Sequence, residues 1–178
     1  MALQKTLTIL RHAKAETGDA GQDDKERGLA ERGEMATKIV GAHLVQCEVN
    51  PDLVLCSDAT RTVKTLRAVE QVYARPLQVR YEPRLYLASA NEMLNLIAEV
   101  PDEVQHLMLV GHNPGMHELA MKLSKEGEEE VIDRLAIKFP TCAVARFNCY
   151  GPDWKTLADS RTRLIDFSSP KMLGQIIQ

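Results

Sequence analysis

Short runs of apolar, often β-branched residues alternate along this chain with longer segments whose apolar residues recur at helical spacing. Strands are predicted for residues 3–10, 52–56, 77–81 and 106–110. Helices are predicted between them for residues 31–46 and 60–73 and, after a cap at Ser89 or Asn91, up to residue 99. This order is typical of a parallel sheet covered by helices on both faces. The sequence therefore predicts an α/β fold, a three-layer αβα domain with a mainly parallel central sheet.

The remaining segments extend the same domain. Residues 13–29 are polar and contain glycines, which predicts a long loop over one face. Residues 116–124 are predicted as a short helix, and the acidic run 125–134 as a solvated loop or a frayed helix. Strands are predicted for residues 141–150 and 164–167, the second of them at an edge of the sheet. No repeat, linker or low-complexity tract divides the chain.

The charge of the chain excludes some classes of function. It has 22 basic and 25 acidic side chains and a net charge of −3, whereas broad binding of nucleic acid or anionic membrane needs a surplus of Lys and Arg. No apolar run reaches the ~20 residues of a membrane span, and the N-terminus lacks the apolar core of a signal peptide. The cysteines have no metal-binding spacing and are predicted to be free, mostly buried thiols of a cytoplasmic protein: Cys47, Cys56, Cys142 and Cys149.

Three of the predicted strands end in residues suited to bind an anion. The first ends in Arg11 and His12, the second leads through Ser57 to Arg61, and the fourth leads to His112. Ligands of open α/β sheets bind outside the carboxyl ends of the strands. Guanidinium groups match phosphate oxygens with bidentate geometry, and Arg61 would lie in the first turn of a helix, where the helix dipole adds positive potential. If these strands are neighbours, the two arginines and the two histidines meet in one phosphate site.

Segments at these strand ends resemble the signature of a known family. The histidine phosphatase superfamily has three signature segments, and this chain has similar ones: Leu-Arg-His-Ala-Lys at 10–14, Ser-Asp-Ala-Thr-Arg-Thr at 57–62 and Gly-His-Asn-Pro at 111–114. Within the family, the chain looks most similar to the small phosphohistidine phosphatases of the SixA type. Further segments resemble that branch at residues 24–33, 85–88, 154 and 167–173, so the resemblance spans nearly the whole chain.

The resemblance implies a phosphoglycerate mutase-like fold, with residues 1–178 as a single histidine phosphatase domain, and phosphoryl transfer without a metal ion or cofactor. His12 would attack phosphorus through a ring nitrogen, and water would then hydrolyse the phosphohistidine intermediate. Arg11, Arg61 and His112 would hold the phosphoryl oxygens. His12 would be neutral, with its other nitrogen bonded to a backbone carbonyl, and His112 would be protonated. We therefore expect activity to depend on pH around neutrality.

The chain departs from the family pattern at positions that bear on the substrate. Ala13 replaces the glycine that commonly follows the Arg-His pair, a change that SixA-like proteins tolerate. Ala15 and Gly18 stand where mutase-like relatives usually have a serine and an asparagine that bind phosphate, which disfavours a mutase. No inserted cap domain is visible, so we expect an open pocket. An open pocket favours a phosphorylated protein over an enclosed small metabolite.

The general acid is left open by the sequence. Glu82 follows the third predicted strand, roughly where acid-bearing relatives place a proton donor, but a solvated loop glutamate is an equal alternative. Lys14 and Arg27, in the first long loop, are candidates for contact with the substrate. His117 follows His112 by five residues, which is not the spacing of a helical zinc site. His117 could line the rim of the pocket, but we expect no catalytic role for it.

Together, these observations predict a cytoplasmic, metal-independent phosphatase that acts on phosphohistidine of a protein. Two alternatives remain: a phosphomonoesterase for small molecules on the same fold, and a phosphate-binding module without activity. The second is disfavoured because a pure binder has no need for a nucleophile such as His12. A metal-dependent hydrolase is disfavoured because the sequence has no clustered set of Asp and His ligands.

Overall fold

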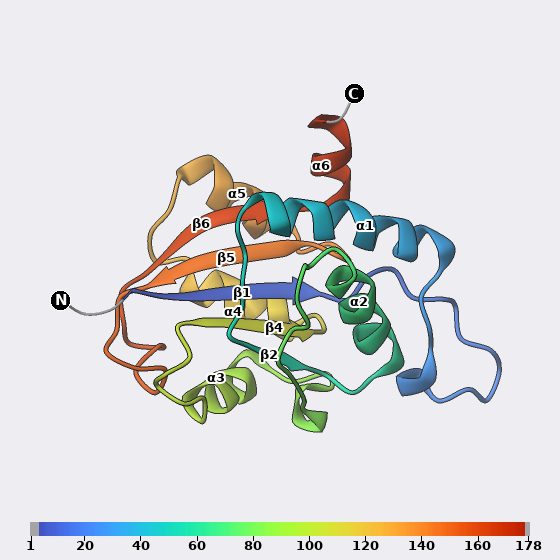
Figure 1. The fold of residues 1–178 in the computed structure, drawn as a ribbon, viewed down its shortest axis with the longest axis horizontal. Helices are drawn as coiled ribbons and strands as arrows, with labels where there is room; N and C mark the ends of the chain where they lie inside the picture. Colours follow the sequence, from blue (N-terminus) through green and yellow to red (C-terminus); the bar gives the residue numbers. More distant parts are fainter. Residues whose placement is uncertain (1–3, 177–178) are drawn as a thin grey trace.

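Six strands form one mixed sheet within residues 4–176, the part of the chain that the computed structural model describes (Figure 1). They are β1 (Lys5–Arg11), β2 (Leu53–Cys56), β3 (Val79–Tyr81), β4 (His106–Gly111), β5 (Val144–Cys149) and β6 (Thr162–Ser168). Their order is β3-β2-β4-β1-β5-β6. β1 to β4 run parallel, whereas β5 is antiparallel to both β1 and β6. The mainly parallel sheet is confirmed, with β6 at its edge; Leu3, in the first predicted strand, lies outside the described residues.

Helices cover both faces of this sheet (Figure 1). One face carries α1 (Glu31–Gln46), α2 (Thr60–Glu70) and α6 (Pro170–Ile176). The other carries α3 (Ala90–Ala98), α4 (Gly115–Leu123) and α5 (Glu129–Ile137). Two short 3-10 turns lie in loops, η1 (Asp24–Glu26) and η2 (Pro83–Leu85). The predicted three-layer αβα arrangement is confirmed.

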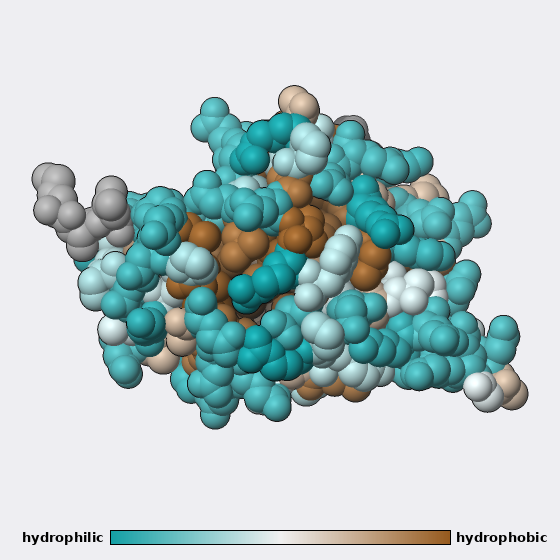
Figure 2. All heavy atoms as spheres, turned by 60° about the horizontal axis from the view of Figure 1, so that its bottom comes forward, coloured by the Kyte–Doolittle hydropathy of each residue, from teal (hydrophilic) through white to brown (hydrophobic). Residues whose placement is uncertain are grey.

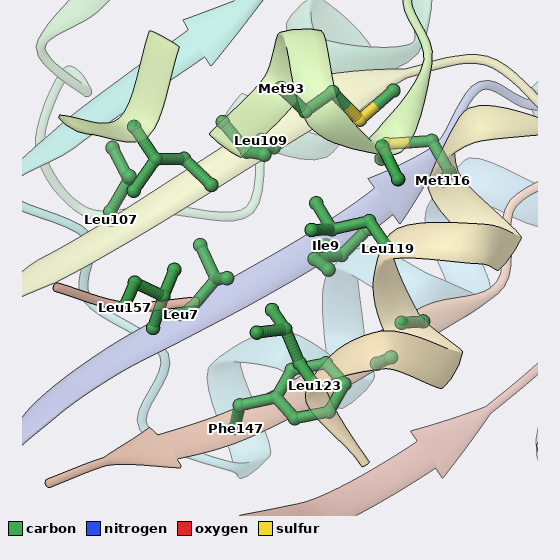
Figure 3. Close-up of a cluster of buried hydrophobic side chains, with 14 of the residues drawn as sticks. Leu7, Ile9, Met93, Leu107, Leu109, Met116, Leu119, Leu123, Phe147 and Leu157 are labelled. Carbon is green, nitrogen blue, oxygen red and sulfur yellow. The ribbon is translucent and has the colours of Figure 1, made fainter. Parts of the chain in front are cut away.

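Strand β1 contributes side chains to the hydrophobic layers on both faces of the sheet, because successive side chains of a strand point to opposite faces. It directs Leu7 and Ile9 toward the α3–α5 side, where they lie in one cluster with Leu119 and Phe147 (Figure 3). Leu10 belongs to the cluster beneath α1 and α2. These three β1 side chains are 0% exposed, and burying a side chain of this size contributes about 1.5–3 kcal/mol. Packing on both faces therefore fixes the residues at the carboxyl end of β1.

The predicted helix boundaries agree with the structure except at some ends. α1 covers the predicted range 31–46, and Ser89 rather than Asn91 caps α3. The Ser89 hydroxyl accepts from the backbone N–H of Glu92, and the Glu92 carboxylate accepts in return from the N–H of Ser89, which is a capping box. α2 ends at Glu70 instead of residue 73. Pro76 follows shortly, and a proline disfavours helical backbone angles at the residue before it.

Two segments near the C-terminus form helices that the sequence did not clearly predict. The acidic run at 125–134 was predicted as a solvated loop or frayed helix, but α5 is a regular helix from Glu129 to Ile137. It forms because Leu135 is 0% exposed, and Val131 and Ile132 pack against the same cluster. α6 was not predicted, although its Leu173 belongs to the cluster beneath α1 and α2.

The surface is mostly hydrophilic on the face shown in Figure 2, where the lower edge of Figure 1 has been turned forward. Hydrophobic residues gather in the middle of that face and are surrounded by hydrophilic ones. Within residues 4–176, no helix combines the length and apolar character that crossing a membrane requires.

Gly115, the first residue of α4, has no room for a side chain. A Cβ there would lie 1.9 Å from the carbonyl oxygen of Ala88. We expect Gly115→Ala to lower the free energy of unfolding by about 1–3 kcal/mol, because α4 and the segment around Ala88 must move apart. Urea denaturation measures the loss. In α6, no atom of the described residues lies within 4 Å of a Cβ built on Gly174, so Gly174→Ala should stabilise by about 0.5–1 kcal/mol; similar losses for both variants would contradict the prediction.

Candidate active site

A cavity of about 460 Å³ lies at the carboxyl ends of the central strands. β4 lies between β1 and β2 in the sheet, so the ends of these three strands are adjacent. The structure brings all four predicted site residues to this cavity: Arg11, His12, Arg61 and His112. The other lining residues are Lys14, Ala15, Asp24, Arg27, Leu87, Asn113 and Thr141. We call this space the strand-end cavity.

His12 follows the last residue of β1, and hydrogen bonds fix its ring. Its backbone N–H donates to the Gly111 carbonyl over 3.1 Å. Its ring Nδ1 lies 2.7 Å from the carbonyl oxygen of Ala13; because a carbonyl only accepts, Nδ1 carries the proton and Nε2 carries the lone pair. Burial, with a smaller contribution from the charges of Arg61 and Arg11, lowers the pKa of His12 to about 4. The ring is therefore neutral at pH 7, as the resemblance implied, and its bond goes to a backbone carbonyl.

His112 faces His12, with the two ring centroids 5.2 Å apart. Its Nε2 lies 2.8 Å from Ser57 Oγ. Burial, followed by the proximity of His12 and Arg61, lowers the pKa of His112 to about 3. The protonated His112 that the resemblance implied is therefore not the form that its surroundings favour in this structure. A bound phosphate dianion would place negative charge beside the ring and raise this pKa.

The two guanidinium groups are held in fixed directions. Arg61 lies in the first turn of α2 and is 2% exposed. Its Nη1 donates to the backbone carbonyl of Asp24 over 2.7 Å, and its Nη2 lies 3.0 Å from the Asp24 carboxylate. Arg11 Nη1 donates to the Phe139 carbonyl over 2.8 Å. Both side chains are thus oriented before any ligand binds.

Several buried nitrogens of these residues have no hydrogen-bond partner within the described part of the chain. They are Arg11 Nε, Arg61 Nε and His112 Nδ1. Leaving a buried polar group unpaired costs about 1–3 kcal/mol, which an oxyanion that supplies acceptor oxygens would offset. This donor set suits a phosphate group.

Asp24 closes the first long loop over the cavity. Its carboxylate accepts from the Tyr86 hydroxyl over 2.6 Å and forms ion pairs with Arg27 at 2.6 Å and Arg61 at 3.0 Å. The hydrogen bond from Tyr86, together with those from Arg27 and Arg61, holds the pKa of Asp24 well below its usual range. The sequence indicated Asp24 only as part of a motif, and its link to Arg61 joins residues 37 positions apart.

The two loop residues considered for substrate contact, Lys14 and Arg27, both line the cavity. Sequence reasoning missed the roles of Leu87, Asn113 and Thr141 there. Leu87 has a φ of 50° and is 53% exposed, which places an apolar side chain at the rim. Asn113 lies in the Gly-His-Asn-Pro segment and Leu87 in the segment 85–88, both similar to the family, whereas nothing near Thr141 in the sequence indicated a site.

Glu82 and His117 do not line the cavity. Arg84 donates to both carboxylate oxygens of Glu82, at 2.9 Å through Nε and 2.8 Å through Nη2. These bonds lower the pKa of Glu82, so the group is ionised, whereas a general acid must hold a proton. The position of Glu82 therefore does not support the role of general acid considered for it. His117 Nε2 donates to the Leu135 carbonyl over 2.7 Å, away from the cavity.

One group of possible metal ligands occurs within residues 4–176. His43 and Cys47 of α1 and Asp166 of β6 place ligand atoms within 4.8 Å of one another. His43 Nε2 lies 2.9 Å from Asp166 Oδ2, and the Arg146 guanidinium donates to the Cys47 carbonyl at 3.3 Å. Positive charge so close disfavours a cation. We interpret the group as a polar link between α1 and β6, and none of its members lines the strand-end cavity.

Comparison with known proteins agrees with this geometry. Residues 7–137, most of the chain, match the histidine phosphatase superfamily (branch 1). The chain belongs to this family. An uncharacterised family relative from Mycobacterium tuberculosis is 33% identical over 164 residues, covering 91% of this chain and 100% of that protein.

Solved structures resemble this histidine phosphatase over nearly its whole length. A protein of Agrobacterium tumefaciens assigned as phosphohistidine phosphatase SixA has a TM-score of 0.79 and 32% identity, covering 93% of this chain and 98% of that one. One of Nakamurella multipartitia with the same assignment has a TM-score of 0.81 and 29% identity, covering 94% and 96%. A protein histidine phosphatase SixA complexed with tungstate shares the fold, with a TM-score of 0.73, 21% identity, and coverage of 93% and 97%.

The depressed pKa of His12 gives this histidine phosphatase a testable pH dependence. The folded chain protonates His12 only near pH 4, whereas an ordinary histidine takes up a proton near 6.5. The unfolded chain therefore binds more protons between these values, and the free energy of unfolding contributed by this group falls as pH drops from about 6.5 to 4. In ¹⁵N NMR titrations of the imidazoles, we expect the resonance absent from His12→Gln to titrate near pH 4. A midpoint near 6.5 would contradict the burial argument and restore a dependence around neutrality.

Proposed function

We propose that this histidine phosphatase hydrolyses phosphohistidine on a protein, with His12 as the nucleophile. The observation that carries the proposal is the bond from His12 Nδ1 to the Ala13 carbonyl, which leaves Nε2 unprotonated in a cavity shared with Arg11 and Arg61. An oriented neutral imidazole among anion-binding groups suits nucleophilic attack on phosphorus. A protein that only binds phosphate would need the arginines but not this nucleophile.

In the first step, Nε2 of His12 attacks phosphorus, and the bond between phosphorus and the substrate's ring nitrogen breaks. The leaving nitrogen keeps the bonding electron pair. The leaving imidazole departs neutral when its second ring nitrogen already carries a proton, so this step needs no acid residue. Arg11, Arg61 and His112 would stabilise the charge on the three phosphoryl oxygens.

In the second step, water attacks the phosphoryl group on His12. The bond between phosphorus and Nε2 breaks, and Nε2 recovers its lone pair while inorganic phosphate leaves with the oxygen and protons of the water. Nδ1 keeps its proton throughout, because the Ala13 carbonyl accepts it. The positive charge that the reaction needs comes from arginines, so the proposed mechanism uses no metal ion.

The choice of a phosphohistidine substrate rests on the fact that the carboxylate in the cavity is held ionised and cannot donate a proton to a leaving group. Among the residues described as lining it, Asp24 is the only carboxylate, and Tyr86, Arg27 and Arg61 engage it as an anion. An alkoxide leaving group needs a proton donor, whereas a protonated phosphoramidate does not. The likeness to proteins assigned as SixA phosphohistidine phosphatases supports the same choice. A related SixA binds tungstate, an oxyanion that resembles phosphate in shape.

A side-by-side measurement of kcat/KM tests the proposal. The substrates are a chemically phosphorylated phosphohistidine protein, p-nitrophenyl phosphate and a panel of sugar phosphates, all assayed with EDTA present. We expect turnover of the phosphohistidine protein to exceed that of the sugar phosphates and to be blocked by vanadate. Equal or faster turnover of sugar phosphates would favour a small-molecule phosphomonoesterase. Vanadate binding without any turnover would indicate a phosphate-binding module.

Glu82→Gln provides a separate test of the leaving-group argument. We expect the variant to keep kcat/KM for phosphohistidine within about twofold, because Glu82 is paired with Arg84 outside the cavity, while loss of a general acid typically costs about 10²–10⁴-fold. The matched control is Glu99→Gln, since Glu99 pairs with the same arginine at 2.9 Å. A loss above about tenfold in Glu82→Gln alone would return the acid role to Glu82.

We also propose that residues 1–178 act as one histidine phosphatase domain in the cytoplasm. Support for a single domain comes from the one sheet that joins β1 near the N-terminus to β6 near the C-terminus. Support for a reducing compartment comes from the four cysteines, which are free and mostly buried.

A further inference from the structure

A second cavity, of about 410 Å³, adjoins the strand-end cavity. The two share Lys14 and Thr141, so their walls are continuous. The remaining lining residues come from the start of α1, the segment after α5, and the start of α6: Arg32, Ala36, Lys138, Pro140, Ser169, Pro170 and Lys171. We call this second cavity the basic groove. A molecule that extends out of the strand-end cavity past Lys14 and Thr141 would enter it.

The groove concentrates positive charge in a chain whose net charge is −3. Lys14, Arg32, Lys138 and Lys171 line it, and no acidic residue does. All four are exposed, and none forms an ion pair with a carboxylate in the described part of the chain. Elsewhere, exposed Arg84 and Arg161 are neutralised by neighbouring glutamates. Four unpaired cations around one cavity attract an anionic partner.

The kind of cation and the apolar lining indicate what that partner is. Three of the four cations are lysines, which act as mobile point charges, whereas a fixed second phosphate group favours arginines with converging donors. Ala36, Pro140 and Pro170 add apolar surface between the charges. Spread positive charge around apolar surface fits a polypeptide with acidic side chains better than a small bisphosphate.

We propose that the basic groove binds an acidic segment of the phosphoprotein substrate, next to the histidine whose phosphoryl group enters the strand-end cavity. This rests on the proposed function, and it adds the feature that selects the substrate: Asp or Glu residues flanking the phosphohistidine. The groove contributes affinity and orientation and takes no part in the bond-breaking steps. Because its cations are exposed, binding weakens as salt screens them over a Debye length of about 8 Å at physiological ionic strength.

A binding experiment tests the groove without requiring turnover. The probe is a fluorescein-labelled peptide of alternating Glu and Ala residues, titrated with the full chain by fluorescence anisotropy, with excess vanadate to occupy the strand-end cavity. The groove variant combines Arg32→Gln, Lys138→Gln and Lys171→Gln. The control variant removes the same charge outside both cavities, through Lys122→Gln, Lys155→Gln and Arg163→Gln.

We expect the groove variant to raise the Kd of the acidic peptide about tenfold and the control variant to raise it less than about twofold. A peptide of alternating Gln and Ala residues should bind neither protein measurably. Equal affinity of the native chain and the groove variant for the acidic peptide would overturn the proposal. Equal losses in both variants would also overturn it, because net charge rather than the groove would then explain binding.

A kinetic comparison links the groove to the substrate. Two phosphohistidine peptides are compared, one with Glu and one with Gln around the phosphohistidine. We expect the ratio of their kcat/KM values to favour the Glu peptide by about tenfold in the native chain and to fall toward one in the groove variant. If neither peptide is hydrolysed, the proposed function fails, while the anisotropy result still decides whether the groove binds acidic polypeptide. A small bisphosphate is assayed beside the peptides. If the groove variant loses turnover of the bisphosphate but keeps the native ratio for the two peptides, the groove binds small molecules and the proposal is wrong.

Discussion

Replacing His12 with alanine is expected to lower kcat for phosphohistidine by at least about a thousandfold, because the other imidazole among the described residues of the cavity is not free to replace it as nucleophile. His112, the nearest imidazole at 5.2 Å between ring centroids, has its Nε2 engaged with Ser57 Oγ. Its Nδ1 belongs to the buried donor set proposed for the phosphoryl oxygens, so it would contact oxygen rather than attack phosphorus. The loss should therefore be nearly complete and should appear in kcat rather than in KM alone.

The covalent intermediate gives an independent readout of the same role. After rapid quenching with ³²P-labelled substrate, native protein should carry a label that is labile in acid and stable in base, and His12→Ala should carry none. His117→Ala is the matched control, since that histidine bonds to the Leu135 carbonyl outside the cavity. We expect the control to keep kcat within about twofold. An equal loss in both variants, or full label in His12→Ala, would refute the assignment of the nucleophile.

The meeting of the four site residues could be predicted from the sequence on the condition that their strands are neighbours, because it depends on sheet topology rather than on detailed packing. Arg11 and His12 follow β1 and His112 follows β4, and β1 and β4 pair in parallel, with Arg11 opposite Gly111. Carboxyl ends of neighbouring parallel strands meet at one edge of a sheet. A strand order that places β4 next to β1 is therefore sufficient to bring these residues together. The pairing of β2 with β4 brings Arg61, which follows β2, to the same edge of the sheet.

The protonation state of His112 could not be predicted from the sequence, because it depends on what the fold buries around the ring. The chain order shows that His112 follows a strand, but not that the ring is 1% exposed or that His12 and Arg61 lie beside it. The same applies to Asp24, whose carboxylate reaches Arg61 and Tyr86 only when the long loop closes. Long-range contacts of this kind leave no local sequence pattern.

Glu82 and α5 show how local patterns mislead. Glu82 lies next to β3, as an acid donor should, yet Arg84 two residues on captures its carboxylate. The acidic residues near α5 favoured a solvated segment, but the apolar side chains of α5 pack against the buried cluster on the α3–α5 side of the sheet. The basic groove was likewise hidden, because Lys14, Lys138 and Lys171 come together from three separate parts of the chain.

Arg61 differs from a simple phosphate ligand because its guanidinium has two tasks. Nη1 and Nη2 both donate to Asp24, which holds the first loop closed, while Nε is buried and has no partner within the described residues. A lysine at this position would keep the positive charge but offers a single nitrogen on a flexible stem. It could not hold Asp24 at two points and also direct a donor to a phosphoryl oxygen.

We therefore expect Arg61→Lys to lower kcat/KM for phosphohistidine by about 10²–10³-fold, close to the effect of removing a donor that stabilises the transition state. Vanadate affinity should fall in parallel, because vanadate resembles that transition state. Arg67→Lys, on the same helix but exposed and outside the cavity, is the matched control. Near-native kcat/KM in Arg61→Lys would show that charge alone suffices there. A loss of activity with unchanged vanadate affinity would instead mean that Arg61 acts by holding Asp24 and the loop, and not by binding the phosphoryl group.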